Sequence, residues 1–179
     1  VLRSEGREDA RMSYQVEVSP LKDYGLINLR GGVPVTANWE AALDVTFPKA
    51  AHTAVINEAF SVLSLASDHW WVRTTLKNED ELFHRLSEST SGEHAAVTVV
   101  TDHFQGFSVQ GADAVAVLRQ GFSLDLRSLD SGQCTRGGFA RCGATLQVVE
   151  AGMDYEIFVE ASYSEYVERW LKVAQGHTV

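Results

Sequence analysis

The stretch from Val97 to Asp125 constrains the fold more than any other part of the sequence. It begins with five consecutive β-branched residues at positions 97–101, a composition typical of a strand that is at least partly buried. Residues 102–103 form a polar break, and the alternation over residues 106–110 predicts a second strand. We expect these two strands to form a common surface on which the next element packs.

A short helix is predicted directly after the second strand, opening at Gly111. Val115, Leu118 and Phe122 recur at steps of three and four residues, so they lie on one face of that helix. Gly121 is expected to end the helix, because glycine enters the left-handed conformation without strain. A helix this short is stable only when its apolar side packs on other elements. The stretch therefore predicts a packing unit and no catalytic site.

The rest of the chain alternates between strand patterns and helix patterns. Strands are predicted over residues 14–20, 25–32, 60–66, 69–75, 137–150 and 155–160. Helices are predicted over residues 36–44, from residue 78 and from residue 162. This order predicts an α+β protein of mainly antiparallel sheets with helices on one face. The similar order of elements in the two halves also suggests an internal duplication.

Two of the helix starts have the spacing of a capping box, in which two side chains bind each other's backbone N–H groups. These pairs are Asn78 with Glu81 and Ser162 with Glu165. The apolar side of the last helix follows a 3.6-residue period and consists of Tyr163, Tyr166, Val167, Trp170, Leu171 and Ala174. Gly176 is expected to end this helix.

The length of 179 residues favours one domain over residues 14–176, or two tightly packed halves at about 14–92 and 93–176, after a flexible N-terminal segment at 1–13. The 24 acidic and 15 basic residues give a net charge of −9. Nucleic acid and anionic membranes are therefore not expected partners, because both attract a positive surface. The sequence has no apolar run near the ~18 to 20 residues of a membrane span and begins with no hydrophobic signal segment, so we expect a cytoplasmic protein.

Cys134 and Cys142 are the only cysteines of the chain. If one strand runs through both, their Cα atoms lie about 26 Å apart at ~3.3 Å per residue. A disulfide needs Cα atoms within about 7 Å, so this arrangement excludes one. Their spacing also matches no metal or redox motif, and we expect two reduced thiols.

No pattern of catalytic, cofactor-binding or metal-binding residues stands out. No two of the six histidines have the i, i+4 spacing of a helical zinc pair. Asp102 could orient the imidazole of His103 for base catalysis, but adjacent residues in a turn seldom face each other. The glycine pairs at 31–32 and 137–138 lie in no dinucleotide fingerprint and fit strand ends or bulges. We therefore predict no catalytic residue, no cofactor and no metal ion in this chain.

Tryptophans and isolated arginines are the candidates for contacts with a partner. Trp70 and Trp71 point to opposite faces of one strand, so one belongs to the core and the other is a candidate anchor for a partner. Packing of both tryptophans inside the protein is the alternative, and Trp39 is a further candidate. Three arginines near glycines fit either an anionic partner group or solvated strand ends: Arg30, Arg136 and Arg141.

Several short segments occur in a characteristic order. They are GLINLRG at 25–31, DHWWV at 68–72, VVTD at 99–102, GFSLDL at 121–126, GQCTR at 132–136 and the strand at 155–159, which leads into the aromatic last helix. Together they resemble the gamma subunit family of heterotetrameric sarcosine oxidases, from about Tyr14 to Ala174. Each motif is modest, and it is their order over nearly the whole chain that makes the resemblance specific.

The resemblance implies a fold like the N-terminal part of the glycine-cleavage aminomethyltransferase, in a complex of four different subunits. In that family the alpha and beta subunits carry FAD, FMN, NAD and the tetrahydrofolate site, and the delta subunit holds zinc. The complex oxidatively demethylates sarcosine to glycine, produces hydrogen peroxide and passes the one-carbon unit to tetrahydrofolate.

The gamma subunit of that family has no known catalytic residue. The resemblance therefore implies a non-catalytic structural subunit with the alpha, beta and delta subunits as partners, alpha being the expected direct contact. Such a subunit is expected to expose an apolar surface that includes Tyr163 or some of the tryptophans.

Two loops depart from the family pattern. Gly111-Ala112 stands where the family usually has Gly-Pro, and Ala66-Ser67-Asp68-His69 stands where it commonly has Gly-Pro-Asp-Glu before the tryptophan strand. Loops with fewer prolines are less rigid. The substrate of the parent complex stays open between sarcosine, dimethylglycine and a methylated proline. The alternative function is a folate-binding one-carbon transferase or a tRNA-editing helper of the same superfamily.

Overall fold

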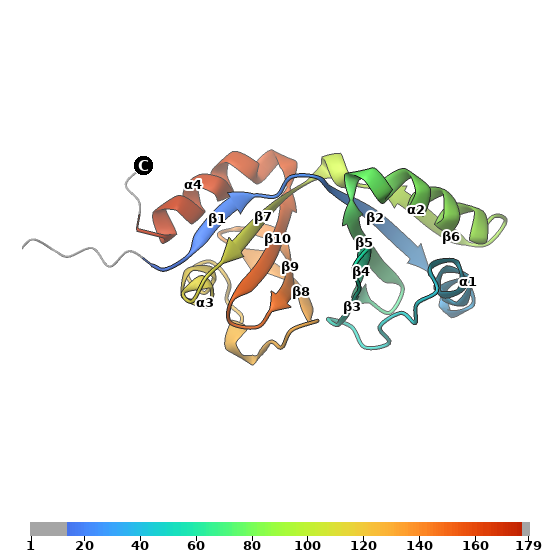
Figure 1. Cartoon of the computed structure of the whole chain (residues 1–179), viewed down its shortest axis with the longest axis horizontal. Coiled ribbons are helices and arrows are strands. Elements are labelled where there is room, and N and C mark those ends of the chain that lie inside the picture. The colour runs from blue at the N-terminus through green and yellow to red at the C-terminus, as the bar shows by residue number, and fades with distance from the viewer. Residues whose placement is uncertain (1–13, 177–179) are drawn as a thin grey trace, which may run out of the picture.

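The computed structural model describes residues 14–176 and contains two five-stranded antiparallel sheets and four α-helices (Figure 1). The first sheet has the order β3-β4-β5-β2-β6, and the second has the order β1-β7-β10-β9-β8. The strands are β1 Glu17–Pro20, β2 Tyr24–Gly31, β3 Ala54–Ile56, β4 Phe60–Ala66, β5 His69–Thr75, β6 Ala95–Val99, β7 Phe104–Gln110, β8 Cys134–Phe139, β9 Cys142–Glu150 and β10 Asp154–Glu160. The helices are α1 Val33–Leu43, α2 Leu76–Ser89, α3 Ala114–Leu118 and α4 Ser164–Ala174. None of these helices has both the length and the apolar character that a membrane-crossing helix requires.

The two sheets repeat one topology. In the first, the succession β2, α1, β4, β5, α2, β6 gives the strand order β4-β5-β2-β6, with β3 added at the edge. In the second, β7, α3, β9, β10 and α4 follow the same order, with β8 added at the edge. The position beside β7 is filled by β1, which pairs Glu17 with Gln110 and comes from the start of the chain. Each sheet therefore uses residues from beyond the expected division at 92 and 93, since β6 belongs to the first sheet and β1 to the second.

The sheets lie face to face, and the helices cover their outer faces (Figure 1). One apolar cluster joins the second sheet to α3 and α4, and another joins the first sheet to α1 and α2. A third cluster lies between the sheets and includes Leu26, Trp71 and Phe158. The alternation of side chains along each strand produces these layers: on β10, Ile157 points to the helices and Phe158 to the other sheet. The predicted α+β class, with helices on one face of each antiparallel sheet, is confirmed.

Polar side chains also bridge the two sheets. Arg73 of β5 donates two hydrogen bonds to Glu156 of β10, at 2.9 and 2.6 Å, and Ser61 of β4 is bonded to Gln147 of β9. The side chains of Arg73 and Glu156 are only 25% and 13% exposed. Burial raises the pKa of the Glu156 carboxyl above its usual range, although Arg73 opposes this shift. The ion pair therefore fixes how the sheets meet, but removing either partner leaves a poorly solvated group.

The central stretch from Val97 to Asp125 differs from the expected arrangement. Its two strands, β6 and β7, belong to different sheets, and the short 3-10 turn Thr101–His103 carries the chain from one to the other. Thr101 fixes this crossing, because its hydroxyl accepts a hydrogen bond of 2.8 Å from the backbone N–H of Leu26. The expectation that the helix packs on both strands is therefore wrong, and α3 packs in the cluster of the second sheet.

Gly121 does not have the expected left-handed conformation, and α3 already ends at Leu118. Its role is close packing, because a Cβ atom at this position would lie 2.4 Å from the Phe139 ring and 2.9 Å from that of Trp170. Gly176 does have a positive φ of 89°, just after α4, as predicted.

The strand expected over residues 137–150 is a hairpin of β8 and β9. Its turn consists of Ala140 and Arg141, which both have positive φ, of 46° and 73°. Hairpin turns of this kind usually contain Asn or Gly, so the sequence gives no turn signal here. The spacing of about 26 Å between the cysteines was wrong for this reason. Both thiols are free, as expected, and the structure shows that both are buried.

The helix starts also differ from the two predicted capping boxes. α2 begins at Leu76 after Thr75, and α4 begins at Ser164 after the 3-10 turn Ala161–Tyr163. Neither start has a side-chain capping hydrogen bond. The preceding strands extend up to or near these positions, so tertiary pairing overrides the local capping signal.

Replacing Gly121 with Ala is expected to destabilise the protein by about 2 kcal/mol, because the added methyl group overlaps the Phe139 ring. Urea unfolding measures the change. Gly143→Ala is the matched control, since no atom lies within 4 Å of its added Cβ. Equal midpoints for the two variants would contradict the packing role of Gly121.

Replacing Arg73 with Met is expected to cost about 3 kcal/mol at pH 7, because Glu156 is left buried and charged without a partner. The loss should be smaller at pH 5, where the raised pKa of Glu156 lets the folded state take up a proton. Urea unfolding at both pH values measures this.

The double variant Arg73→Met, Glu156→Leu should recover much of the loss. Arg127→Met should leave the unfolding midpoint unchanged, because its partner Asp125 lies on the surface. A loss in Arg73→Met that grows at pH 5 would contradict this account of the ion pair.

Candidate functional site

The three tryptophans proposed as partner anchors are buried in this chain. Trp39, Trp70 and Trp71 are 0%, 5% and 2% exposed, so the expectation of an exposed tryptophan anchor is wrong for them. The pleat sends Trp70 toward α1 and Trp71 toward the second sheet, and both faces are covered. Tyr163 is 44% exposed, as expected for an open apolar surface.

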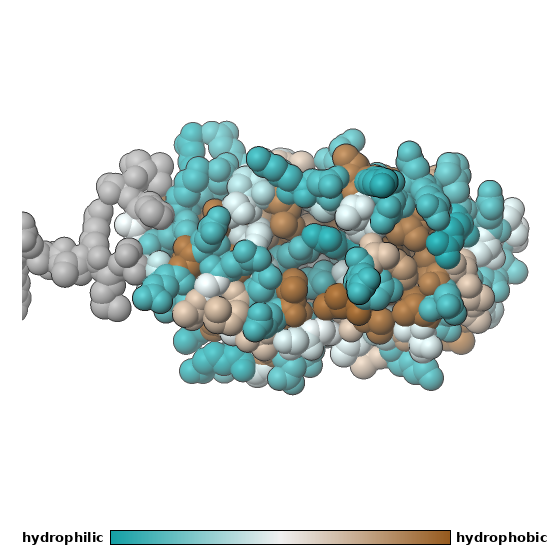
Figure 2. Space-filling model, viewed as in Figure 1, coloured by the Kyte–Doolittle hydropathy of each residue, from teal (hydrophilic) through white to brown (hydrophobic). Residues whose placement is uncertain are grey.

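Other exposed apolar side chains are spread over several elements. On the face shown in Figure 2, hydrophobic residues gather mainly over the half that contains the first sheet. The large exposed apolar residues are Val33, Ile56, Leu76, Val99, Leu124, Val149, Met153, Tyr163, Tyr166 and Val173. Val33, at the start of α1, is the most open of them at 83% and stands at the rim of a pocket.

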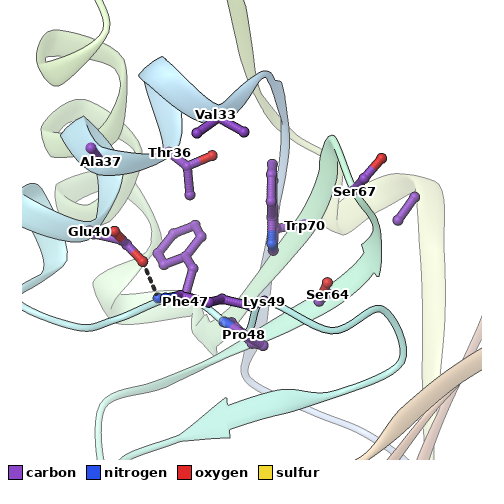
Figure 3. A pocket seen from close by; sticks show the side chains of 11 residues that line it. Val33, Thr36, Ala37, Glu40, Phe47, Pro48, Lys49, Ser64, Ser67 and Trp70 are labelled. Carbon is purple, nitrogen blue, oxygen red and sulfur yellow. Dashed lines mark hydrogen bonds between the residues drawn. The ribbon is translucent and has the colours of Figure 1, made fainter.

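This pocket, which we call the α1 pocket, lies between α1, the segment after it and the β4–β5 hairpin (Figure 3). Its volume is about 430 Å³. The side chains that line it are Val33, Thr36, Ala37, Glu40, Phe47, Pro48, Lys49, Ser64, Ala66, Ser67 and Trp70. Aromatic and aliphatic groups form most of this lining, and a few polar groups stand among them, as in typical ligand sites.

The aromatic part of the α1 pocket is held rigidly. The rings of Phe47 and Trp70 lie 5.9 Å apart, and Trp39 also packs edge-on against Trp70 at 6.1 Å. Glu40 accepts a hydrogen bond of 2.7 Å from the backbone N–H of Phe47 and so ties the segment after α1 to the helix (Figure 3). Gly31 lets α1 approach, because a Cβ there would lie 2.9 Å from the Trp39 ring.

Two indole N–H groups of this region have no hydrogen-bond acceptor within residues 14–176. They are Nε1 of Trp39, in the core, and Nε1 of Trp70, which lines the α1 pocket. Buried donors are nearly always paired in folded proteins, so each of these groups needs a physical explanation. Trp70 lines the α1 pocket, although its nitrogen has almost no exposed surface.

The sequence pointed to Trp70 but missed the other half of the pocket wall. Neither Phe47 nor Pro48 was among the residues that the sequence singled out. The useful signal was an apolar aromatic residue directly before proline in a short connection, where a solvated loop would carry polar side chains.

A second cluster lies on β2 and β5 around Asn28. The Asn28 side-chain oxygen accepts a hydrogen bond of 3.1 Å from the Trp71 indole and lies 2.7 Å from Nε2 of His69. Because Asn28 oxygen is an acceptor, Nε2 of His69 carries the proton. Burial lowers the pKa of His69 to about 4, and the positive charges of Arg30 and Arg136 act in the same direction. His69 is therefore neutral at pH 7.

Two of the three arginines proposed as partner contacts, Arg30 and Arg136, lie close enough to His69 for their charges to act on it. Arg30 lies 3.7 Å from Asp68, and both side chains are about half exposed, so this pair adds little stability. Arg136 is exposed on β8, and Arg141 lies in the β8–β9 turn. Arg30 thus remains accessible to a partner, whereas the neighbouring Trp71 is enclosed.

The other sequence candidates form no catalytic group among the described residues. Asp102 and His103 are both exposed in the 3-10 turn, no hydrogen bond joins their side chains, and His103 packs on Phe104 at 4.8 Å. Over residues 14–176, no group of three or more His, Cys, Asp or Glu side chains could hold a metal ion. Burial raises the pKa of the Cys134 thiol to about 12, so this thiol is not a nucleophile at neutral pH.

Acidification should destabilise the protein through His69. In the unfolded state the His69 imidazole binds a proton near pH 6.5, whereas in the folded state its pKa is about 4. The free energy of unfolding therefore decreases as the pH falls between these two values. The full effect corresponds to about 3 kcal/mol. His69→Gln keeps an N–H donor for Asn28 and should remove this part of the pH dependence. Urea unfolding of both proteins from pH 7.5 to 4.5 measures it, and parallel pH curves would contradict the assignment.

Comparison by sequence finds no match, since no family model and no curated protein matches the chain. Comparison by structure finds several proteins of the same fold. A chain of the heterotetrameric sarcosine oxidase from Corynebacterium sp. U-96, in complex with pyrrole 2-carboxylate, superposes with a TM-score of 0.84 and 21% identity. The match covers 90% of this chain and 84% of that chain.

Two further structures have the same general architecture. The glycine cleavage system aminomethyltransferase T from Bartonella henselae has a TM-score of 0.65 and 16% identity, over 90% of this chain and 46% of that one. This chain therefore spans less than half of the aminomethyltransferase. The regulatory subunit of aspartate kinase from Thermus thermophilus has a TM-score of 0.52 and 14% identity, over 88% and 97% of the two chains. The chain has the aminomethyltransferase-like fold that its sequence predicted.

Proposed function

We propose that this chain is the non-catalytic gamma-type subunit of a sarcosine-oxidase-type complex. The supporting observation is the extent of the structural match, which includes nine tenths of this chain and more than four fifths of a chain of such an oxidase. Two chains that correspond over nearly their full lengths fit the same place in an assembly better than a fragment of a larger enzyme does. The ordered sequence motifs around Trp70 and Cys134 point to the same family.

In this proposal the complex oxidatively demethylates sarcosine, or a related N-methyl amino acid, to glycine with production of hydrogen peroxide and transfer of the one-carbon unit to tetrahydrofolate. FAD, FMN, NAD and tetrahydrofolate are held by partner subunits, and zinc is held by the delta subunit. The alpha subunit is the direct neighbour of this chain. The half-exposed Arg30 and the exposed Tyr163 are the residues we assign to that contact.

The alternative is a folate-binding one-carbon transferase or a tRNA-editing helper. Its support is the match to the aminomethyltransferase, whose fold this chain shares. The match extends over only 46% of that enzyme, so the chain corresponds to one part of a larger molecule. The structural subunit is therefore the better-supported function.

Co-expression with the products of neighbouring genes tests the proposal. We expect a stable complex with flavin absorbance and sarcosine-dependent peroxide formation, measured by light scattering, absorbance and a peroxidase assay. Omitting this chain should reduce the yield of the assembled complex. A chain that stays alone with all the neighbours present, and whose thermal midpoint rises with tetrahydrofolate, would favour the transferase alternative.

Arg30→Gln should weaken assembly if Arg30 meets a carboxylate of the partner. Arg127→Gln is the matched control, because Arg127 is also exposed but donates two hydrogen bonds to Asp125 of its own chain, whereas Arg30 only approaches Asp68 at 3.7 Å. Equal assembly of the two variants would remove Arg30 from the contact without affecting the larger proposal.

A further inference from the structure

We propose that the α1 pocket is a binding site for a small organic carboxylate with an apolar body. The inference is independent of the subunit assignment, because it depends only on the residues around Trp70. Three observations carry it: the size and lining of the pocket, an indole N–H that lacks an acceptor, and the charge distribution around that N–H.

The pocket has the dimensions and the walls of a small-molecule site. Its volume of about 430 Å³ lies within the ~300 to 1,000 Å³ that is usual for ligand pockets. Phe47 and Trp70 provide aromatic walls that are held in place by Trp39 and by the Glu40 hydrogen bond. Val33, 83% exposed, leaves an apolar rim open to solvent. An apolar ring or branched chain that enters from this rim is removed from water on several sides.

The Trp70 indole supplies a specific polar contact. Trp70 is 95% buried, and its Nε1–H is a donor that has no acceptor within residues 14–176. In Figure 3 the nitrogen end of the ring lies on the side of Pro48, Lys49 and Ser64. An indole N–H can only donate, so the group that satisfies it must be an acceptor such as an oxygen. Bonding a ligand oxygen would remove the cost of leaving this donor unpaired.

The charges around the N–H favour an anionic acceptor. Lys49 is the one cationic side chain in the lining of the pocket, and it belongs to the same side as the indole nitrogen (Figure 3). The Glu40 carboxylate lies beyond the Phe47 ring from Trp70 and is already bonded to the backbone of Phe47. A carboxylate between Lys49 and Trp70 therefore gains an ion pair and a charge-assisted hydrogen bond.

Entry of the carboxylate requires a small movement of the segment at Pro48 and Lys49, because the indole nitrogen has almost no exposed surface. This segment lies between α1 and β3, and within residues 14–176 neither of its two residues makes a hydrogen bond. Moving it leaves the strand pairing of both sheets intact.

The test uses 3-phenylpropanoate as the carboxylate, 3-phenylpropanamide as its neutral analogue and acetate as a carboxylate without an apolar body. Binding to the full chain is measured by calorimetry and by the ¹H–¹⁵N NMR signals of the tryptophan side chains, assigned with single Trp→Phe variants. We expect 3-phenylpropanoate to bind at least about 10-fold more tightly than either analogue and to shift the Nε1–H signal of Trp70 but not that of Trp39.

Lys49→Gln should weaken binding of 3-phenylpropanoate about 10-fold and leave binding of the amide unchanged. Lys172→Gln is the matched control, since Lys172 is an exposed lysine on α4 that pairs with Glu168. Both lysine variants keep Trp70 in place, so the test does not depend on a core substitution. Equal affinity for the acid and the amide, an equal effect of the two lysine variants, or an unshifted Trp70 signal would overturn the proposal.

Discussion

The contact between the two sheets is the constraint on which the rest of the structure depends. Because the sheets face each other and carry helices outside, most residues of the inner strands are buried, whereas the edge strands β1 and β6 stay largely exposed. Polar side chains are tolerated between the sheets only where they find partners, as Arg73 does with Glu156 and Ser61 does with Gln147. These paired groups also make one relative position of the sheets more favourable than others, which the purely apolar contacts around Leu26 and Phe158 would specify less sharply.

The sequence predicted the class of fold, most strands and helices and the buried positions Val167, Leu171 and Ala174 of the last helix, because each depends on a local period. Tyr163 and Tyr166 were placed on the same apolar side but are exposed. It failed where a distant contact decides the conformation. The strands around Thr101 read as neighbours but separate into two sheets, and the Ala140-Arg141 turn carries no turn residue. Trp70 was proposed as an exposed anchor for a partner but is buried, because it packs on α1 and Phe47, which no spacing in the sequence connects with it. The sequence therefore drew attention to Trp70 but did not predict the pocket that this residue lines.

The two topologically equivalent halves have diverged where their first helices pack. α1 has 11 residues, its Trp39 packs on Trp70 of β5, and a pocket remains beside the helix. α3 has only five residues, and the connection that follows it places the Phe122 ring 4.8 Å from that of Phe139. The second half thus uses its aromatic residues to fill space, and the first half keeps some of that space open. If the halves arose by duplication, this difference explains why a ligand site would persist in only one of them.

The position of β1 has a consequence for the order in which the molecule is completed during synthesis. The ribosome produces β1 first, but its partner β7 begins more than 80 residues later, at Phe104. All strands of the first sheet are available once Val99 has emerged. The second sheet is complete only after β10 has been made and β1, which was synthesised much earlier, has paired with β7. Closing such a long loop is entropically costly and slow. Until then β7 has an open edge, so the nascent second half is the part of this chain most in need of protection from aggregation.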